Sequence, residues 1–355
     1  MVEGKNTAAG GGTKVQQVGS GEADAKSKNW RYSWPRQGGL LVLFALLVFV
    51  GALASIGLGS VPISPQEIFA SLTGGTGTHE QILRNIRLPR TLVAALTGVN
   101  LALAGAILQA IMRNPLADPH IIGISSGAGL MGILVLLALP EAGWLVTPAA
   151  FLGALGAALL IYVLAWKNGI QPLRIILAGV AVSAFFGACI SALMILNSDR
   201  VHSALIWLVG GLSARSWPQV TLLAPYTCVG GVLALLGARQ LNILQLGDDM
   251  AQGLGLRVEL ARLWLTAVAA LLAASAVAVV GLLGFVGLIV PHAARLLIGS
   301  DHHWLLPASA LLGAALVMLA DTFARTAFAP LELPVGIIMS VLGAPFFLFL
   351  LRRQL

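Results

Sequence analysis

Long apolar runs separated by short polar breaks cover most of the chain from residue 40 onward. A helical run of about 20 apolar residues matches the roughly 30 Å hydrocarbon core of a bilayer. The pattern therefore predicts an all-α polytopic membrane protein with ten transmembrane helices. The predicted spans are 40–58, 91–112, 122–139, 145–166, 175–196, 220–236, 263–281, 283–298, 305–320 and 335–351.

Three segments outside these runs also carry helical patterns. Residues 200–218 hold an apolar stretch that is too short to span, so we predict a short re-entrant helix after the fifth span. Ser64, followed by Pro65 and Glu67, is typical of a helix N-terminus and predicts a short surface helix over residues 63–72. The Asp- and Gly-containing segment 241–259 predicts two short helices outside the bilayer.

The composition excludes a soluble enzyme. Of 355 residues, 58% are apolar and 10% are charged, whereas a soluble domain has about 25% charged residues. No P-loop is present in the sequence, and acidic residues stand almost wholly at span ends, with Asp321 the nearest exception. The chain therefore has neither its own nucleotide site of that type nor the buried acids of an ion-coupled carrier, and we see no nucleic-acid signature. Its drive must come from a partner, unless it is a passive pore.

The distribution of basic residues predicts the orientation of the chain. If both termini are cytoplasmic, 15 of the 21 Lys and Arg residues fall on the cytoplasmic side, which satisfies the positive-inside rule. Residues 1–36 are polar and lack an apolar run, so they are predicted to form a disordered cytoplasmic tail. Residues 37–355 are predicted to form a single transmembrane permease domain. The six arginines left outside are Arg84, Arg87, Arg90, Arg200, Arg215 and Arg325.

A faint internal repeat relates the two halves of the chain. Residues 105–129 share an order of Gly, Pro-His and Ile-Gly with residues 281–299. Because these segments fall in spans two to three and seven to eight, the halves would have opposite orientations. We therefore predict inverted-repeat halves.

Six ordered motifs carry a resemblance to one family. The sequence resembles the permease subunit of the type II ABC importers for ferric siderophores, haem and cobalamin, the FecCD family, from about residue 40 to its end. The motifs are RLPRTL (87–92), GAILQAIMRNPLADP (105–119), GISSGAG (123–129), LGDDMAQGLGL (246–256), GFVGLIVPHAARLL (284–297) and ELPVGIIMSVLGAPFFLFLL (332–351).

The resemblance implies the partners and the cargo. It implies a permease in the bacterial inner membrane that pairs with a second permease copy, most simply as a homodimer. Two ATPase subunits would bind ATP and Mg on the cytoplasmic side, and a periplasmic substrate-binding protein would dock outside. This chain would bind no cofactor and no metal. The expected cargo is an iron chelate, either a ferric siderophore or haem, with cobalamin as the alternative. An ion-coupled secondary transporter and an intramembrane enzyme are remoter alternatives.

The resemblance also implies roles for two sets of residues. Arg87, Arg90 and Arg325 match family positions that pair with acidic residues of the binding protein. Segment 241–259 would be the element that couples the permease to the ATPase. Its matching residues are Leu246, Gly247, Asp248, Met250, Ala251, Leu254 and Gly255.

The cytoplasmic gate and the translocation path are expected at two further places. The gate residues would be Asn114 and Leu116 in the Asn-Pro-Leu turn, with Gln171 and Pro172 between spans four and five. Pro172 departs from the small hydroxylated residues found there in the family. Candidate path residues on span five are Ser183, Phe186 and Met194. The histidines are expected to have structural or solvent roles, because a chelated cargo already occupies the ligand sites of its metal.

Overall fold

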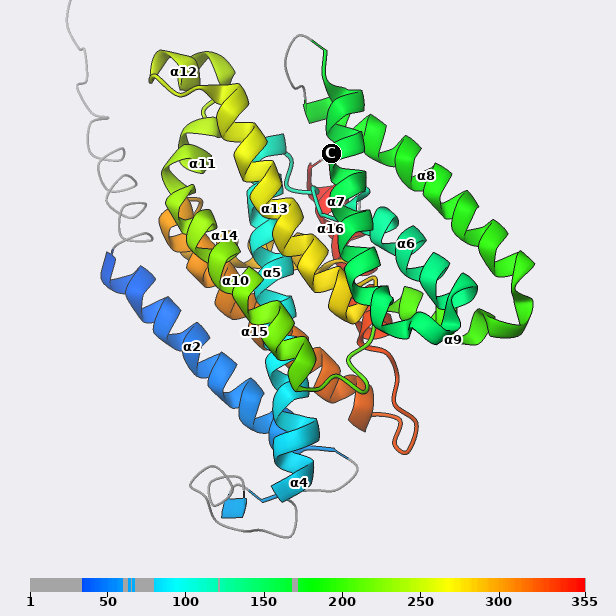
Figure 1. Cartoon of the computed structure of the whole chain (residues 1–355). Coiled ribbons are helices and arrows are strands. Elements are labelled where there is room, and N and C mark those ends of the chain that lie inside the picture. Colours follow the sequence, from blue (N-terminus) through cyan, green and yellow to red (C-terminus); the bar gives the residue numbers. More distant parts are fainter. Residues whose placement is uncertain are drawn as a thin grey trace, which may run out of the picture.

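All regular structure in the described part of the protein is helical (Figure 1). The computed structural model describes residues 34–59, 63–64, 66–67, 80–120, 122–167 and 172–354. The ten principal helices are α2 (Trp34–Gly57), α5 (Leu88–Met112), α6 (Ile124–Ala138), α7 (Val146–Ala165), α8 (Pro172–Leu196), α10 (Trp217–Leu236), α13 (Val258–Val280), α14 (Val286–Ile298), α15 (His302–Thr326) and α16 (Val335–Gln354).

These helices occupy the ten predicted spans. Eight described helical stretches are long and apolar enough to cross a membrane. The other two, α6 and α14, are apolar but have only 15 and 13 residues. The all-α membrane class is confirmed, whereas the number of crossings, the inverted repeat and the sides of the termini stay predictions. Helix α2 already begins at Trp34, so residues 34–36 belong to it and not to the predicted tail.

Short helices occupy the breaks in which helical patterns were predicted. Helix α9 (Val201–Val209) lies at the predicted re-entrant segment, and α11 (Ala238–Leu244) and α12 (Asp248–Gly253) lie at the predicted coupling segment. Helix α4 (Glu80–Ile82) continues through a π-helical turn, Leu83–Arg87, into α5. Within the predicted surface helix, the Glu67 amide donates to Ser64 Oγ and the Ser64 amide donates to Glu67 Oε2. Its other positions, 65 and 68–72, lie outside the described residues.

Helix α5 is the centre of the bundle and contacts α10, α13, α14 and α15. Glycines allow the backbone of α5 to pack closely against the backbones of its neighbouring helices. A Cβ atom added to Gly98 would overlap the Gly313 carbonyl in α15, and one added to Gly105 would overlap the Gly287 backbone in α14. In a membrane, where apolar side chains gain little by leaving lipid, such close backbone contact supplies the packing energy.

The two ends of α5 lie at opposite ends of the molecule. In Figure 1, α12 and the C-terminal end of α16 lie toward the top, while α4 and the connection from α15 to α16 lie toward the bottom. The basic start of α5 is therefore at the lower end and its Asn-Pro-Leu turn is at the upper end. This single helix connects the two regions for which functional sites were predicted.

Candidate functional site

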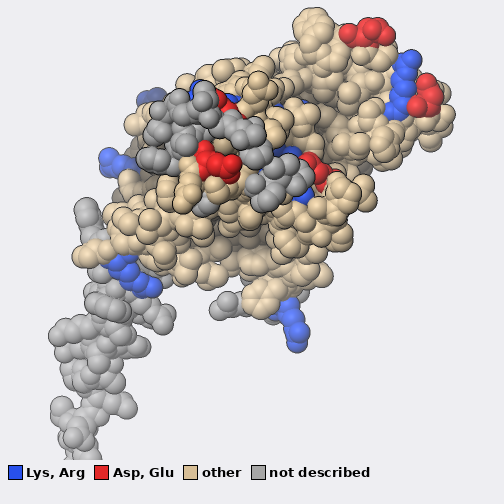
Figure 2. Space-filling model, turned by 90° about the horizontal axis from the view of Figure 1, so that it is seen from below, with Lys and Arg blue, Asp and Glu red and all other residues tan. Residues whose placement is uncertain are grey.

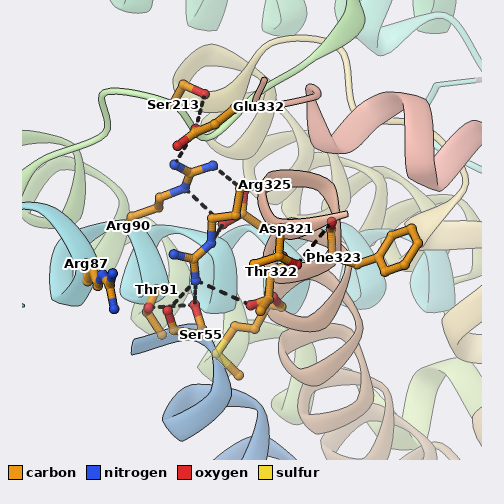
Figure 3. A network of polar contacts seen from close by, with 12 residues as sticks. Ser55, Arg87, Arg90, Thr91, Ser213, Asp321, Thr322, Phe323, Arg325 and Glu332 are labelled. Atoms are coloured by element: carbon orange, nitrogen blue, oxygen red, sulfur yellow. Dashed lines mark hydrogen bonds and ion pairs between the residues drawn. The ribbon is translucent and has the colours of Figure 1, made fainter. Parts of the chain in front are cut away.

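A buried ion-pair cluster joins α5, α15 and the segment before α16 at the lower end (Figure 3). The Arg90 guanidinium donates from Nε and Nη2 to the two carboxylate oxygens of Asp321, both at 2.9 Å. Its Nη1 donates to Glu332 Oε2 at 2.8 Å. Arg90 is 7% exposed and Asp321 is 1% exposed, so this pair is shielded from water.

The other two arginines of the predicted docking set extend the cluster to the end of α2. Arg87 Nη1 donates to the carbonyls of Ile56 and Gly57 at 2.7 and 3.0 Å. Arg325 Nη2 donates to the Ser55 carbonyl, and Arg325 Nε lies 3.6 Å from Asp321. Side chains from four parts of the chain thus meet around three buried guanidinium groups.

The structure gives these arginines partners within their own chain. Arg87, Arg90 and Arg325 are 5%, 7% and 7% exposed. An acidic group of another protein would have to compete with Asp321 or Glu332 for Arg90. Among the residues drawn in colour, Figure 2 shows basic and acidic side chains side by side at the lower end. The docking role of the three arginines stays a prediction, and their ties between helices are an additional role that the sequence did not indicate.

Glu332 makes the lower cluster sensitive to acid. Partial burial would raise the pKa of its carboxyl, but the hydrogen bond and charge of Arg90, with the Ser213 hydroxyl, lower that pKa below its ordinary value. A group whose pKa is depressed by folding stabilises the fold above its unfolded pKa, and that stabilisation is lost as pH falls through the folded value.

We therefore expect Glu332→Gln to reduce the loss of thermal stability as the pH falls below the unfolded glutamate pKa of about 4.3 and through the lower folded value. Its effect at neutral pH should be below about 1 kcal/mol, because the Glu332 side chain is 45% exposed. Thermal unfolding of the detergent-solubilised protein at each pH measures both effects. Glu141→Gln, at an exposed position, is the control. Identical acid sensitivity in wild type and Glu332→Gln would contradict the prediction.

At the upper end, α5 ends in a tight turn that contains the predicted gate residues. Arg113 adopts a left-handed conformation (φ 49°) and closes the helix. The Leu116 amide donates to Asn114 Oδ1 at 2.9 Å, and the Asn114 amide donates to the Gln109 carbonyl at 3.1 Å. Asparagine commonly shapes turns through such contacts with the next amides. Pro172 is the first residue of α8, and Gln171 lies outside the described residues.

The predicted coupling segment has an apolar outer face. Leu246, Met250 and Leu254 are 58%, 61% and 59% exposed. Ala251 is fully buried beneath them. Gly247 and Gly255 have positive φ angles of 100° and 80°, which favour glycine and bound the short helix α12. A group of exposed apolar side chains is a candidate surface for another protein to cover.

Comparison with known proteins places the chain in one family. The sequence matches the model of the FecCD transport family over residues 46–353. The chain belongs to this family. The membership that the six motifs predicted is thereby confirmed.

Relatives within the FecCD family are iron, haem and cobalamin permeases. The Fe(3+)-citrate import system permease protein YfmE of Bacillus subtilis is 43% identical over 88% of this chain and 95% of its own length. The hemin transport system permease protein HmuU of Yersinia pestis is 42% identical over 89% of this chain and 95% of its own length. The cobalamin import system permease protein BtuC of Halobacterium salinarum is 46% identical over 78% of this chain and 75% of its own length.

A solved structure gives the same assignment at the level of the fold. It is described as a metal-chelate type ABC transporter in an inward-facing conformation. It superimposes with a TM-score of 0.79 and 31% identity, over 89% of this chain and 99% of that chain. This FecCD protein is therefore a permease of a metal-chelate type ABC importer, as its relatives are transport permeases.

The predicted path residues of this FecCD permease lie on the inner side of α8. Ser183 Oγ approaches Gly123 at the start of α6, and Phe186 and Met194 are partly buried against the main core. The open side of α8 instead exposes large apolar residues such as Phe185 and Ile195. In a single chain, the three predicted residues thus contribute to packing, and their place along a path stays a prediction.

Proposed function

We propose that this permease moves an iron chelate, a ferric siderophore or haem, from the periplasm to the cytoplasm across the bacterial inner membrane. The observation that carries the proposal is the similarity to two relatives of named function. A ferric citrate permease and a hemin permease are 43% and 42% identical to this chain, each over 95% of the relative's length. Cobalamin is the alternative, because the archaeal cobalamin permease is 46% identical over a shorter stretch.

The energy for transport would come from two partner ATPase subunits, which would hold ATP and Mg. The exposed face of Leu246, Met250 and Leu254 supports this proposal, because its apolar side chains require a covering partner. In this arrangement the upper end of the molecule is cytoplasmic, as the positive-inside rule predicts. This chain needs no cofactor for that role.

A second copy of the chain would complete the path. Helices α8 and α16 leave large apolar residues exposed, among them Leu177, Phe185, Val341 and Phe349. In our proposal a homodimer covers part of these surfaces and encloses the path between the copies, while lipid covers α2 and α7. A periplasmic binding protein would dock at the lower end, over the cluster that contains Arg87, Arg90 and Arg325.

Reconstitution in liposomes tests the proposal. The permease, its ATPase and its binding protein would be offered radiolabelled ferric citrate, haemin and cyanocobalamin in separate assays. We expect uptake of ferric citrate or haemin that requires both ATP and the binding protein. Uptake of cyanocobalamin alone would select the alternative cargo. Uptake driven by an ion gradient without ATP would overturn the proposal.

A further inference from the structure

Asp248, the first residue of α12, points inward and joins the coupling segment to the bundle. Its carboxylate accepts two hydrogen bonds from the Arg262 guanidinium on α13, at 2.7 and 2.9 Å. The Arg262 side chain is only 3% exposed, and that of Asp248 is 37% exposed. A bidentate arginine–carboxylate pair has a defined geometry as well as favourable energy. Asp248 therefore fixes the start of α12 to α13.

The same carboxylate also contacts the predicted gate turn. Arg113, which closes α5 immediately before Asn114, places its Nη2 3.5 Å from Asp248 Oδ1. Gly247 leaves room for this contact, since a Cβ atom added there would lie 3.3 Å from Arg113 Nη1. Both side chains of the Arg113–Asp248 pair are more than a third exposed. It is thus the longer and more hydrated contact of the two, and the one that can break and re-form more easily.

The remaining contacts of the coupling segment differ from this one. Helix α11 is tied to the start of α15, where Asn242 Nδ2 donates to Asp301 Oδ1 at 2.7 Å and Asn242 Oδ1 lies 2.8 Å from Nδ1 of the buried His302. These contacts fix α11 to α15. Among the charged contacts of α11 and α12 that the structure describes, the Arg113–Asp248 pair alone reaches the gate turn.

The gate turn also has space beside it. A cavity of ≈ 300 Å³ is lined by Gln109, Arg113, Asn114, Pro115, Gln245 and Arg295. Below it, Gln109 Oε1 accepts from Arg295 Nη2 on α14 at 3.0 Å. A displacement of the turn can therefore be taken up by this cavity without compression of a packed core.

We propose that Asp248 is a positioning residue that transmits motion of the coupling segment to the gate turn through Arg113. The ATPase would push on the apolar face of α12. Asp248, held by Arg262, would carry this motion to Arg113 and change the position of Asn114. The inference rests on the proposed function, since it requires an ATPase at the coupling segment. It assigns to Asp248 a role in contacts within its own chain, whereas the family resemblance implied that Asp248 contacts the ATPase.

Arg113→Gln tests the inference, because it removes only the contact to the gate turn and keeps the Asp248–Arg262 pair. In liposomes with ATPase and binding protein, we expect ATP hydrolysis within about twofold of wild type. The ratio of uptake to ATP hydrolysis, measured with radiolabelled ferric citrate or haemin, should fall at least about tenfold. A tenfold change corresponds to roughly 1.4 kcal/mol. Arg113→Lys keeps the charge and should restore at least half of the wild-type ratio.

Arg352→Gln is the matched control. Arg352 is exposed near the end of α16, outside the coupling segment, and makes no ion pair among the described residues. This variant should keep the wild-type ratio of uptake to hydrolysis. The inference is overturned if Arg113→Gln also keeps that ratio, or if it loses ATPase binding, which would give Arg113 a docking role. Absence of ATP-dependent uptake in the wild type would instead refute the proposed function.

Discussion

Replacement of Arg90 by glutamine is expected to destabilise the folded permease by about 3–5 kcal/mol, the usual cost of removing one partner from a buried ion pair. The reason is Asp321, which is 1% exposed and accepts both of its short hydrogen bonds from Arg90. Without the guanidinium, the carboxylate would remain buried with a weaker contact to Arg325, at 3.6 Å. Thermal unfolding in detergent measures the effect, followed by size-exclusion chromatography of the heated sample.

Two further variants test whether the loss of stability comes from the unpaired Asp321 or would follow any substitution at the lower end. Arg90→Gln combined with Asp321→Asn should recover part of the stability, because the buried carboxylate is then removed, while Arg325 loses its contact with Asp321. Arg84→Gln should cost less than about 0.5 kcal/mol, since Arg84 is half exposed and pairs with Glu80 at i,i+4. Wild-type thermal stability of Arg90→Gln would contradict the prediction. Loss of binding-protein docking by an Arg90 variant becomes informative only when its fold is intact.

Gly105→Ala is expected to reduce the yield of folded permease severely. The added methyl group would overlap the backbone of Gly287, and two packed helices can relieve such an overlap only by moving apart. We expect a penalty of about 3 kcal/mol or more, at the upper end of the range for overpacking. The monodisperse fraction after extraction from the membrane, together with the unfolding temperature, measures it.

Gly156→Ala in α7 is the control, for which we expect no loss of stability. Apart from its chain neighbours and the backbone of its own helix, no atom of the described residues lies within 4 Å of a Cβ added to Gly156. Within a helix, alanine is favoured over glycine by about 0.5–1 kcal/mol, so this variant should be as stable as wild type or more so. Equal stability of Gly105→Ala and Gly156→Ala would show that α5 and α14 do not approach as closely as described.

The apolar pattern was sufficient to locate the principal helices, but it misplaced several of their ends, and α15 shows why. Residues 305–320 were predicted as the ninth span, whereas α15 extends from His302 to Thr326. A hydropathy pattern treats Asp321 and Arg325 as the end of a span, because a lone charge is costly in lipid. Within the bundle these charges are compensated by one another and by Arg90, so the helix continues through them.

For each contact in the candidate sites, the sequence identified one residue of the pair but not its partner. The motifs and the charge distribution identified Arg90, but not that Asp321 and Glu332 hold it, because those residues follow 231 and 242 positions later. In the same way, the motif around Asp248 indicated a coupling element, while its pairing with Arg113 and Arg262 depends on how α5 and α13 pack. Local patterns indicate which residues are charged, and only the fold determines which charges meet.

The central helix has a mechanical consequence. With 25 residues, α5 is about 37 Å long at 1.5 Å per residue. It is clamped near its midpoint, where Gly98 and Gly105 press on neighbouring helices and Asn100 donates to Ser275 at 3.0 Å. A straight rod held at its middle responds to a sideways force at one end by tilting, so its other end moves in the opposite direction. If α5 tilts during transport, this mid-helix clamp would be its pivot, and the contacts of Arg87 and Arg90 at the lower end would have to yield.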